Sequence, residues 1–427
     1  MPRMTRPLYT LLYTLLLPVI LLRLLWRSRQ APAYRQRWRE RFGCFPAPAF
    51  DCNKPVLWLH AVSVGETLAA VPLIKTLQNQ HSDWQWVVTT TTPTGSERVR
   101  AVLGNSVFHV YAPYDLPIFL THFLQRVKPA ILIVMETELW PNMVHSCYQH
   151  QIPVLIANAR LSEKSARGYG KFSALTHQML REITQVAAQQ HADGERFVQL
   201  GLPRENLTIT GSIKFDLTLD AATQQKAAAL RVQWSNNHSR KVWLAASTHQ
   251  GEDGILLAAF AQLKKTFPDL LLVLVPRHPE RFASVTQQCT AAGFIVLRHS
   301  EQKTLAPETD IVVGDTMGEL LAFYGAADIA FVGGSLVPVG GHNLIEPAAW
   351  ACPIISGSQL FNFSEVETLL RDNNALAIAD NAEQITAQMA QWLHDETLRK
   401  GFGERAKAVA DNNRGALESL CSLIDPT

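Results

Sequence analysis

The sequence lacks the cysteine and aspartate patterns on which metal sites are usually built. Its six cysteines are scattered singly along 427 residues, and none forms a C-x-x-C pair. This distribution excludes a zinc-ribbon site and a disulfide framework, and it fits a reducing cytoplasm, where single cysteines behave as small apolar residues. A D-x-D triplet is also absent. We therefore expect no bound metal.

Two nucleotide-binding fingerprints are missing as well. The chain contains neither the G-x-G-x-x-G spacing of a dinucleotide fold nor the G-K-[ST] of a P-loop. These absences argue against hydride transfer and ATP hydrolysis as the reaction that the protein catalyses. No low-complexity tract and no repeat of fixed period is present, and 47% of the residues are hydrophobic, which is typical of a globular chain long enough for two domains.

Excess positive charge is absent from most of the chain and is gathered at its start. Residues 1–41 hold nine arginines and one acid, Glu40, which gives +8; the other 30 basic and 36 acidic residues give −6, and +8 − 6 recovers the net charge of +2. An acidic body argues against nucleic acid as a partner. The arginines are Arg3, Arg6, Arg23, Arg27, Arg29, Arg35, Arg37, Arg39 and Arg41.

An uncharged apolar stretch, Pro7–Leu22, lies inside this basic segment. It is shorter than the ~20 residues of a membrane-spanning helix, but continuation to Trp26 reaches that length. An apolar helix beside a run of arginines is a two-signal anchor. We therefore expect residues 1–41 to hold the protein to membrane lipid at the cytoplasmic face, with arginines near lipid phosphates. A buried core helix is the alternative, and the sequence leaves open whether the helix spans the bilayer or lies in its surface.

Short apolar runs alternate with helix-period segments beyond residue 41. This β-α alternation predicts parallel sheets covered on both faces, the doubly wound α/β arrangement. We expect an N-terminal domain over 42–216, an inter-domain region over 217–240 and a C-terminal domain with terminal helices over 241–427. Ligands would bind in a cleft between the domains, beyond the carboxyl ends of strands. The expected strands are 55–60, 84–92, 107–113, 130–136, 153–159, 183–189, 207–212, 241–247, 270–276, 294–299, 310–315, 329–335 and 352–356.

The stretch "GGHNLIEPAAW" joins a strand to a helix in the C-terminal domain. Asn343 would cap the helix and Glu346 would lie three residues further on, as in a capping box, which explains both residues without a ligand. That explanation leaves the preceding glycines unused, and glycines let amide N–H groups approach an anion. We therefore expect this loop to hold a nucleotide, with Glu346 at the ribose. The glycines are Gly333, Gly334, Gly340 and Gly341.

Two further junctions in the same domain could serve the nucleotide. Asp315 or Thr316 would cap a helix that opens near Met317, with Glu319 in its first turn. Another strand end carries two arginines beside a histidine, which suit a phosphate. A capped helix and a solvated loop are the simpler explanations, but three signals in one domain reinforce each other. The residues at the second junction are Pro276, Arg277, His278 and Arg281.

The N-terminal domain offers carboxylates at strand ends. Glu66 begins a helix after the strand that ends at His60, and it could serve as a general base. A glutamate that only stabilises the helix dipole is the alternative. Glu136 and Glu138 follow another strand, and Lys214 follows the last one. Since the carboxyl ends of parallel strands share one edge, we expect these side chains on a common rim.

Taken in order, these stretches resemble the Kdo (3-deoxy-D-manno-octulosonic acid) transferase family of Gram-negative bacteria. The resemblance implies a GT-B glycosyltransferase, with two doubly wound Rossmann-like domains facing a central cleft. Such an enzyme moves Kdo from CMP-Kdo to a lipid A precursor, lipid IVA, in the synthesis of the lipopolysaccharide core. The matching pieces are "HAVSVGE", "TTTTPTGSERV", "APYDLP", "METELWPN", "NARLS", "GSIKFD", "PRHPERF", "GDTMGEL", "FVGGSL" and "GGHNLIEPA".

The same resemblance implies roles for individual residues. Glu66 becomes the base that deprotonates the acceptor hydroxyl, and Glu136 and Lys214 stabilise the transition state. Pro347 departs from members that have alanine there, but proline is acceptable in a first helical turn, so the site is expected to be kept. No cofactor beyond the donor substrate is implied. The residues expected to hold CMP are Pro276, Arg277, Met317, Gly318, Glu319, Asn343, Leu344, Ile345 and Glu346.

The implied chemistry needs neither a metal nor an acid. CMP leaves as an anion, so positive charge and helix dipoles can stabilise it, and a base on the opposite face of the sugar predicts inversion. Two alternatives stay open from the residues. One is another membrane-associated GT-B transferase that uses a UDP- or GDP-sugar, and the other is a non-catalytic nucleotide-binding membrane protein, which would tolerate Glu66→Gln.

Overall fold

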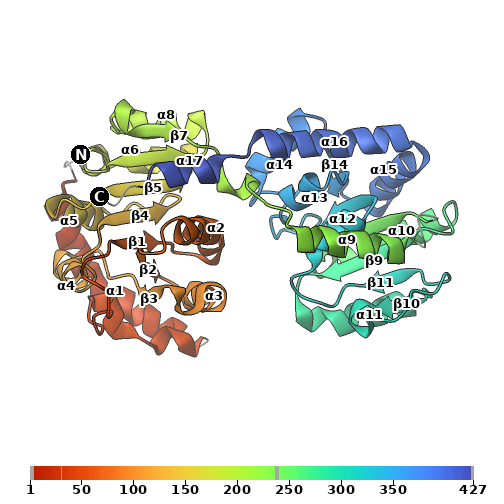
Figure 1. Cartoon of the computed structure of the whole chain (residues 1–427), viewed down its shortest axis with the longest axis horizontal. Helices are drawn as coiled ribbons and strands as arrows, with labels where there is room; N and C mark the ends of the chain where they lie inside the picture. Colours follow the sequence, from red (N-terminus) through yellow and green to blue (C-terminus); the bar gives the residue numbers. More distant parts are fainter. Residues whose placement is uncertain (1–3, 30, 236–239, 425–427) are drawn as a thin grey trace. The chain divides into compact units, whose positions relative to one another are not determined.

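The computed structural model of the protein describes residues 4–29, 31–235 and 240–424 (Figure 1). Three parts of the sequence-based expectations lie outside these ranges: residues 1–3 (with Arg3) and 30 of the basic segment, 236–239 of the inter-domain region and 425–427 of the C-terminal domain. The chain forms two compact units. One consists of the residues up to Asp216 together with those from Arg414 onward, and the other runs from Leu217 to Asn413.

The first unit is built on a seven-stranded parallel sheet in the order β3-β2-β1-β4-β5-β6-β7. The strands read as nearly continuous apolar runs because helices cover both faces. Their bounds are β1 Val56–His60, β2 Gln85–Thr90, β3 Phe108–Tyr111, β4 Ile131–Met135, β5 Val154–Ala159, β6 Gln185–Ala188 and β7 Leu207–Ile209.

Helices connect these strands, and three of them begin with a proline at the first helical position, where its missing N–H costs nothing. The α-helices of this unit are α1 Arg6–Arg27, α2 Val64–Gln80, α3 Pro93–Leu103, α4 Pro117–Val127, α5 Pro141–Gln149, α6 Glu163–Gly170, α7 Ser173–Arg181, α8 His191–Gln199 and α17 Ala416–Ser422. Short 3-10 turns are η1 Pro32–Arg35, η2 Trp38–Phe42, η3 Gly104–Ser106, η4 Arg204–Asn206 and η5 Ile213–Phe215.

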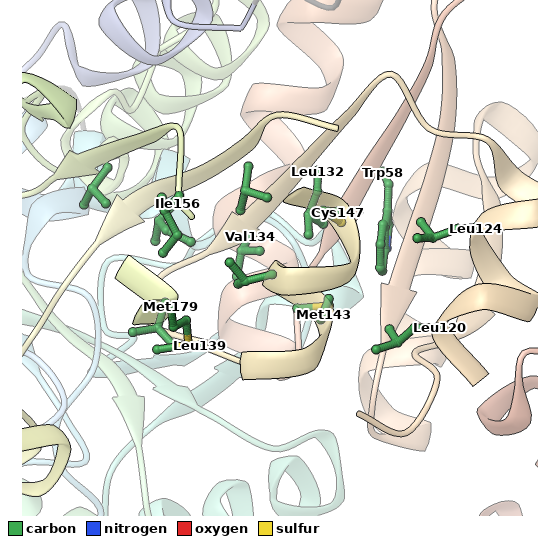
Figure 2. Packing of buried hydrophobic residues seen from close by; sticks show 14 of the residues in the cluster. Trp58, Leu120, Leu124, Leu132, Val134, Leu139, Met143, Cys147, Ile156 and Met179 are labelled. Carbon is green, nitrogen blue, oxygen red and sulfur yellow. The ribbon is translucent and has the colours of Figure 1, made fainter. Parts of the chain in front are cut away.

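The sheet of the first unit separates two hydrophobic cores. Alternate residues of one strand point to opposite faces, so Trp58 of β1 enters one core while Leu57 and Leu59 enter the other. Figure 2 shows Trp58 packed beside Leu120 and Leu124 of α4. Because both faces of the sheet are covered, polar side chains gather in the loops that follow the ends of the strands.

The second unit repeats the architecture with the strand order β10-β11-β9-β8-β12-β13-β14, again parallel throughout. The last strand was not predicted because its run is mostly alanine and leucine, which favour a helix over a strand. The bounds are β8 Val242–Thr248, β9 Leu271–Pro276, β10 Val296–Arg298, β11 Ile311–Val313, β12 Ile329–Val332, β13 Ile354–Ser356 and β14 Leu376–Ile378. The helices and turns are α9 Ala221–Trp234, α10 Glu252–Lys264, α11 Phe282–Ala291, α12 Leu320–Ala326, α13 Ile345–Ala349, α14 Ser364–Asp372, α15 Ala382–His394, α16 Glu396–Asn412, η6 Pro279–Arg281 and η7 His299–Glu301.

The two ends of the second unit differ from the expected boundaries. Most of the expected inter-domain region is the helix α9, which packs on α12 of the second unit. Arg231 of α9 also forms an ion pair at 2.6 Å with Asp328, which lies just after α12. The expected C-terminal domain extended through the terminal helices, but α17 belongs to the first unit. Its Ala416 and Leu420 enter a first-unit core, and Asp216 accepts hydrogen bonds from the backbone of α17 and of the residue before it.

The N-terminal segment is the helix α1, which is long and apolar enough to cross a membrane by length and composition. The expected basic collar is not all available to lipid. Arg41 is buried, donates to the Thr91 carbonyl at 2.9 Å and lies over the Tyr111 ring. Arg37 pairs with Glu40 at 2.6 Å. These two arginines therefore serve the first unit itself.

Candidate active site

In each unit the chain reverses its direction of travel across the sheet beside the first strand. In the first unit β2 lies on one side of β1 and β4 on the other, and in the second unit β9 and β12 flank β8 in the same way. Open α/β sheets bind ligands beyond the carboxyl ends of strands at such a reversal. The loops after β1 and β4, and those after β8 and β12, are therefore where candidate residues should gather.

Glu66 lies in the first turn of α2, directly after the loop that follows β1. The Ser63 hydroxyl donates to one carboxylate oxygen at 2.7 Å, and the Val62 N–H donates to the other at 2.7 Å. Burial raises the pKa of the Glu66 carboxyl, the two hydrogen bonds oppose this, and the charge of Glu136 adds to it. Glu66 thus lies in the first turn of α2, where the helix dipole favours a carboxylate as the simpler explanation held, and it is also an oriented carboxylate of raised pKa.

Glu136 is the residue immediately after β4, and its backbone is strained. It has a positive φ of 58°, which side-chain-bearing residues adopt rarely and at an energetic cost. Its carboxylate lies 3.9 Å from the Lys214 ammonium, and both side chains are partly exposed. Lys214 is carried by η5, which follows β7. The structure thus brings together the two residues expected to stabilise the transition state.

Glu138 completes a group of three carboxylates and was noticed in the sequence without receiving a role. Burial, and then the charge of Glu66, raise its pKa to about 6, while a hydrogen bond from the Trp140 indole at 3.2 Å lowers it. Carboxylates so close together cannot all ionise freely at neutral pH. The spacing of two glutamates after an apolar strand was the signal for this residue.

A cavity of about 400 Å³ lies next to Glu138 in the first unit. Most of its lining is apolar and comes from α7, from the segment between β4 and α5, and from the start of α1. Tyr9, Trp140 and Phe172 are among the lining side chains. The carboxylate group thus borders a hydrophobic groove that also involves the N-terminal helix.

His60 does not take part in this site. It is fully buried at the end of β1, its Nδ1 lies 2.9 Å from the Thr89 hydroxyl, and burial lowers its pKa to about 4. It is a neutral core histidine.

The glycine-rich loop after β12 differs from the expectation that its N–H groups point at a ligand. The backbone N–H groups of Gly334, Ser335 and Leu336 donate to the carboxylate of Glu252 at 2.7 to 3.0 Å, and that of His249 does so at 2.7 Å. A Cβ on Gly333 would come within 2.9 Å of the same carboxylate. The anion that organises this loop is therefore a side chain of the protein.

Asn343 and Glu346 do interact, but not as a standard capping box. Helix α13 begins at Ile345, one residue later than a cap at Asn343 would give. The Asn343 carbonyl oxygen accepts from the Ile345 N–H at 3.0 Å, and its amide donates to the Glu346 carboxylate at 3.2 Å. Burial raises the pKa of Glu346, which Asn343 and the charge of Arg277 oppose. Leu344 and Ile345 are buried, so only their backbone could contact a nucleotide.

The expected helix start near Met317 is also shifted. Helix α12 begins at Leu320, and neither Asp315 nor Thr316 caps it. Asp315 instead accepts from Ser300 and pairs with Arg298 at 2.6 Å. The loop between β11 and α12 leaves the Met317 side chain exposed and places Gly318 at a φ of 84°.

Glu319 is held by three neighbours at the end of this loop. It forms an ion pair with Lys226, accepts from Thr316 and lies 3.3 Å from the His299 ring. Burial acts to raise its pKa, but these partners outweigh burial and the pKa is lowered. Glu319, Lys226 and His299 line a cavity of about 260 Å³ in the second unit.

The junction after β9 separates its two arginines by role. Arg281 pairs with buried Asp253 and donates to the Thr248 carbonyl at 2.6 Å, so it is a structural residue. Arg277 is exposed just past the buried end of β9 at Pro276, and only its charge reaches Glu346 and nearby histidines. Arg277 is therefore the arginine of the pair whose position suits a bound anion.

A pair of histidines was missed by the sequence analysis. The Nε2 atoms of His249 and His342 lie 2.8 Å apart with the rings stacked, and His278 packs edge-on against His249. Burial, and then the charge of Arg277, lower the pKa of His342 to about 4. Each histidine lies in a loop at the carboxyl edge of the sheet, which was the available signal. Among the described residues no group of histidine, cysteine or acidic side chains is arranged to hold a metal ion.

Comparison with known proteins gives a consistent family assignment. A family model described as 3-deoxy-D-manno-octulosonic-acid transferase (kdotransferase) matches residues 36–217, and one described as glycosyl transferases group 1 matches residues 247–409. The 3-deoxy-D-manno-octulosonic acid transferase of Haemophilus influenzae is 43% identical over 425 residues, which cover 99% of each chain.

Two solved structures are similar to parts of the molecule. The C-terminal CMP-Kdo binding domain of WaaA from Acinetobacter baumannii is 34% identical, covers 44% of this chain and 98% of that domain, and has a TM-score of 0.43. UDP-GlcNAc 2-epimerase from Neisseria meningitidis is 14% identical with a TM-score of 0.56, covering 86% of this chain and 99% of that chain, and it supports the GT-B type of fold. On the full-length identity to the Haemophilus enzyme, this chain is a glycosyltransferase that belongs to the 3-deoxy-D-manno-octulosonic acid (Kdo) transferase family.

Proposed function

We propose that the protein transfers Kdo from CMP-Kdo to a lipid A precursor, with inversion and without a metal ion, at the cytoplasmic face of the inner membrane. The observation that carries the proposal is the group of Glu66, Glu136 and Glu138 with Lys214 at the carboxyl edge of β1 and β4. Family membership supports the choice of sugar.

Glu66 acts as the general base. A carboxylate of raised pKa is a better proton acceptor than an ordinary one at neutral pH, and the Ser63 and Val62 hydrogen bonds fix its orientation. Glu66 takes the proton of the acceptor hydroxyl, whose oxygen bonds to the anomeric carbon of Kdo while the bond from that carbon to the CMP phosphate breaks. The carboxylate of Glu136 stabilises positive charge on the sugar in the oxocarbenium-like transition state, and the ammonium of Lys214 stabilises negative charge in the same transition state.

The CMP group is held by the loops at the carboxyl edge of the second sheet. Arg277 is the cation for the phosphate, and the loop Met317–Glu319 and the segment Asn343–Glu346 supply the remaining contacts. Glu346 is half-buried and hydrogen-bonded to Asn343, so its carboxylate is ordered for a ribose diol. The leaving phosphate is already anionic, which removes the need for a proton donor.

A lipid acceptor is supported by the groove beside Glu138. Its apolar lining suits acyl chains. Met4 and Tyr9, at the start of the chain, are part of this lining, so the groove adjoins the segment that we expect at the membrane. A water-soluble sugar acceptor would not require such a lining.

The direct test incubates the purified full chain with CMP-Kdo and a tetraacylated lipid A precursor in the presence of EDTA. We expect the lipid to gain the mass of Kdo and NMR to show an anomeric configuration opposite to that of the donor. Loss of the reaction in EDTA would contradict metal independence, and retention of configuration would contradict inversion. CMP, but not UDP, should raise the melting temperature; the reverse would assign a different donor.

A further inference from the structure

We propose that α1 lies in the plane of one membrane leaflet, with one face on lipid and the other on its own catalytic unit, and does not cross the bilayer. This inference rests on the proposed membrane attachment. It concerns the orientation of the anchor, which the apolar sequence alone leaves open.

The start of α1 is fastened to the first unit by side-chain hydrogen bonds. The Tyr9 hydroxyl donates to the Asp115 carboxylate at 2.9 Å, and the Thr10 hydroxyl donates to the Asn142 side chain at 3.0 Å. Arg6 also reaches Asn142, at 3.3 Å. Asp115 is itself buried and accepts from the backbone N–H groups of Asn142 and Met143 at 3.0 and 2.7 Å. The attachment point is thus a built and buried polar site.

The other end of α1 leads directly back into the same unit. Arg35 donates to the Ser28 hydroxyl at 2.8 Å, which folds η1 against the end of the helix. Arg37 then donates to the His109 carbonyl at 2.8 Å, and Arg41 to the Thr91 carbonyl at 2.9 Å. Both ends of α1 are therefore tied to the first unit.

These two attachments are incompatible with a spanning helix. The 22 residues of α1 extend about 33 Å, close to the ~30 Å of the hydrocarbon core. If α1 crossed the bilayer, its two ends would lie on opposite sides of the membrane. Tyr9 and Arg37 would then have to contact one folded unit from both sides, so the observed hydrogen bonds require an orientation along the surface.

Burial along α1 divides the helix lengthwise. One stripe at helical spacing is half-buried against the protein: Tyr9, Tyr13, Leu17, Ile20 and Leu24. The opposite stripe has the same spacing and is exposed: Leu11, Leu15, Val19, Leu22 and Trp26. Leu15 and Leu22 are 66% and 65% exposed, and together with their neighbours they form a contiguous apolar stripe of the kind that marks a membrane or protein contact. A spanning helix would meet lipid on every side, whereas a helix in the interface has one apolar face.

The charges near α1 fit the headgroups of anionic lipid. Arg23 and Arg27 are exposed in the second half of the helix, and Arg29 follows its end. Basic residues at the surface of an anionic leaflet are attracted to it and strengthen binding. An in-plane helix brings all three to headgroup level, so a bilayer surface with anionic lipid is the partner that both the leucine stripe and the charge predict.

The depth of two labelled positions tests the orientation. In the full chain, with Cys44, Cys52 and Cys421 replaced by serine, Leu15→Cys and Leu22→Cys each receive an environment-sensitive fluorophore. Depth is measured with quenchers placed along the lipid tails, in vesicles of phosphatidylethanolamine and phosphatidylglycerol. We expect equal depths within a few ångströms. A spanning helix predicts a difference of about 10 Å, since seven residues rise 1.5 Å each, and that result would overturn the proposal.

A label at Leu17→Cys is the matched control, because Leu17 lies on the half-buried stripe. It should be quenched less than Leu15→Cys, and equal quenching would contradict the docked face. Absence of quenching at both test positions would also overturn the proposal. Kdo transfer to detergent-dispersed acceptor, measured on the same preparations, separates that failure from a failure of the proposed enzymatic function.

Accessibility of the start of the chain gives an independent check. A Thr5→Cys variant in a Gram-negative host should be protected from a membrane-impermeant thiol reagent in intact spheroplasts and should react in inverted vesicles. Reaction in intact spheroplasts would place Thr5 outside and overturn the proposal.

Discussion

Glu66 and Glu252 occupy equivalent places in the two units, and their surroundings have opposite consequences. Each lies in the first turn of the helix that follows the first strand of its sheet. Glu252 is 0% exposed and accepts from four backbone N–H groups. Glu66 is 8% exposed, accepts from Ser63 and Val62, and has the Glu136 charge beside it.

The difference supports the role proposed for Glu66, because the same position in the fold leaves the two carboxylates with different free hydrogen-bonding capacity. A carboxylate surrounded by backbone donors is stabilised as an anion and has little capacity left for a substrate proton. A carboxylate with two donors and acidic neighbours keeps free lone pairs and a raised pKa. The two glutamates have equivalent positions in the fold, and the number of donors determines how much hydrogen-bonding capacity each one has left.

The largest effect is expected from replacing Glu66, the glutamate that we propose as the base. Glu66→Gln keeps the shape and most hydrogen bonds but removes the base, so kcat should fall about 10²–10⁴-fold. Steady-state kinetics of Kdo transfer measure this, with the melting temperature as a check on folding. Glu163→Gln is the matched control, since Glu163 is an exposed glutamate in the first turn of α6. Equal losses in the two variants would refute the assignment of Glu66.

The second test removes the structural member. Glu252→Ala leaves four backbone N–H groups without their partner, and each buried unsatisfied donor costs about 1–3 kcal/mol. We expect the free energy of unfolding in urea to fall by about 4 kcal/mol or more. The control is Glu383→Ala in the first turn of α15, which is exposed and should change stability by less than about 0.5 kcal/mol. A small effect at Glu252 would mean that a water or ligand replaces its carboxylate.

A smaller change sharpens the role of the Ser63 hydroxyl. Ser63→Ala removes the N-cap of α2 at a cost of about 1 kcal/mol. It also removes a hydrogen bond that lowers the pKa of Glu66. Because the base must be ionised, the acidic limb of the pH–rate profile should move to higher pH. If the acidic limb of the pH–rate profile does not move while the stability falls, Ser63 acts only as a helix cap and does not tune the pKa of Glu66.

The smallest effect concerns the third carboxylate. The pKa of Glu138 is raised from its ordinary value of 4.5 to about 6 in the folded protein, so the folded state binds the proton more tightly than the unfolded chain. Stability should therefore fall as the pH rises from 4.5 through about 6 and stay level above it. We expect a change of about 1 kcal/mol after solvent screening. The difference in unfolding free energy between wild type and Glu138→Gln should show this slope; a difference independent of pH would contradict it.

The strands and most helices could be predicted because strands that are buried on both faces of a sheet consist of continuous apolar residues. Glu66, Glu136 and Lys214 could be placed on one edge for the same reason, since the carboxyl ends of parallel strands coincide. The roles of these residues, and of those expected to hold CMP, stay predictions until variants are measured.

The remaining features depend on long-range contacts that no local pattern contains. Glu252 lies more than eighty residues from the loop that it organises, so the glycines of that loop were read as a ligand site. The pairing of His249 with His342 joins two loops in the same way. The boundary at α12 differs from the expected one because Asp315 pairs with Arg298 and does not cap the helix. At α13, Asn343 accepts from the N–H of Ile345, two residues on, so the helix begins one residue later than a cap at Asn343 would give.

The return of α17 to the first unit has a consequence for how the protein is made. Asp216 holds the backbone just before and within α17, whose Ala416 and Leu420 fill a core together with α2. Synthesis proceeds from the N-terminus, so the ribosome completes the entire second unit before it supplies these residues. The core of the first unit therefore stays incomplete until a segment about two hundred residues beyond its last strand has been synthesised. All residues of the second unit are synthesised before that segment.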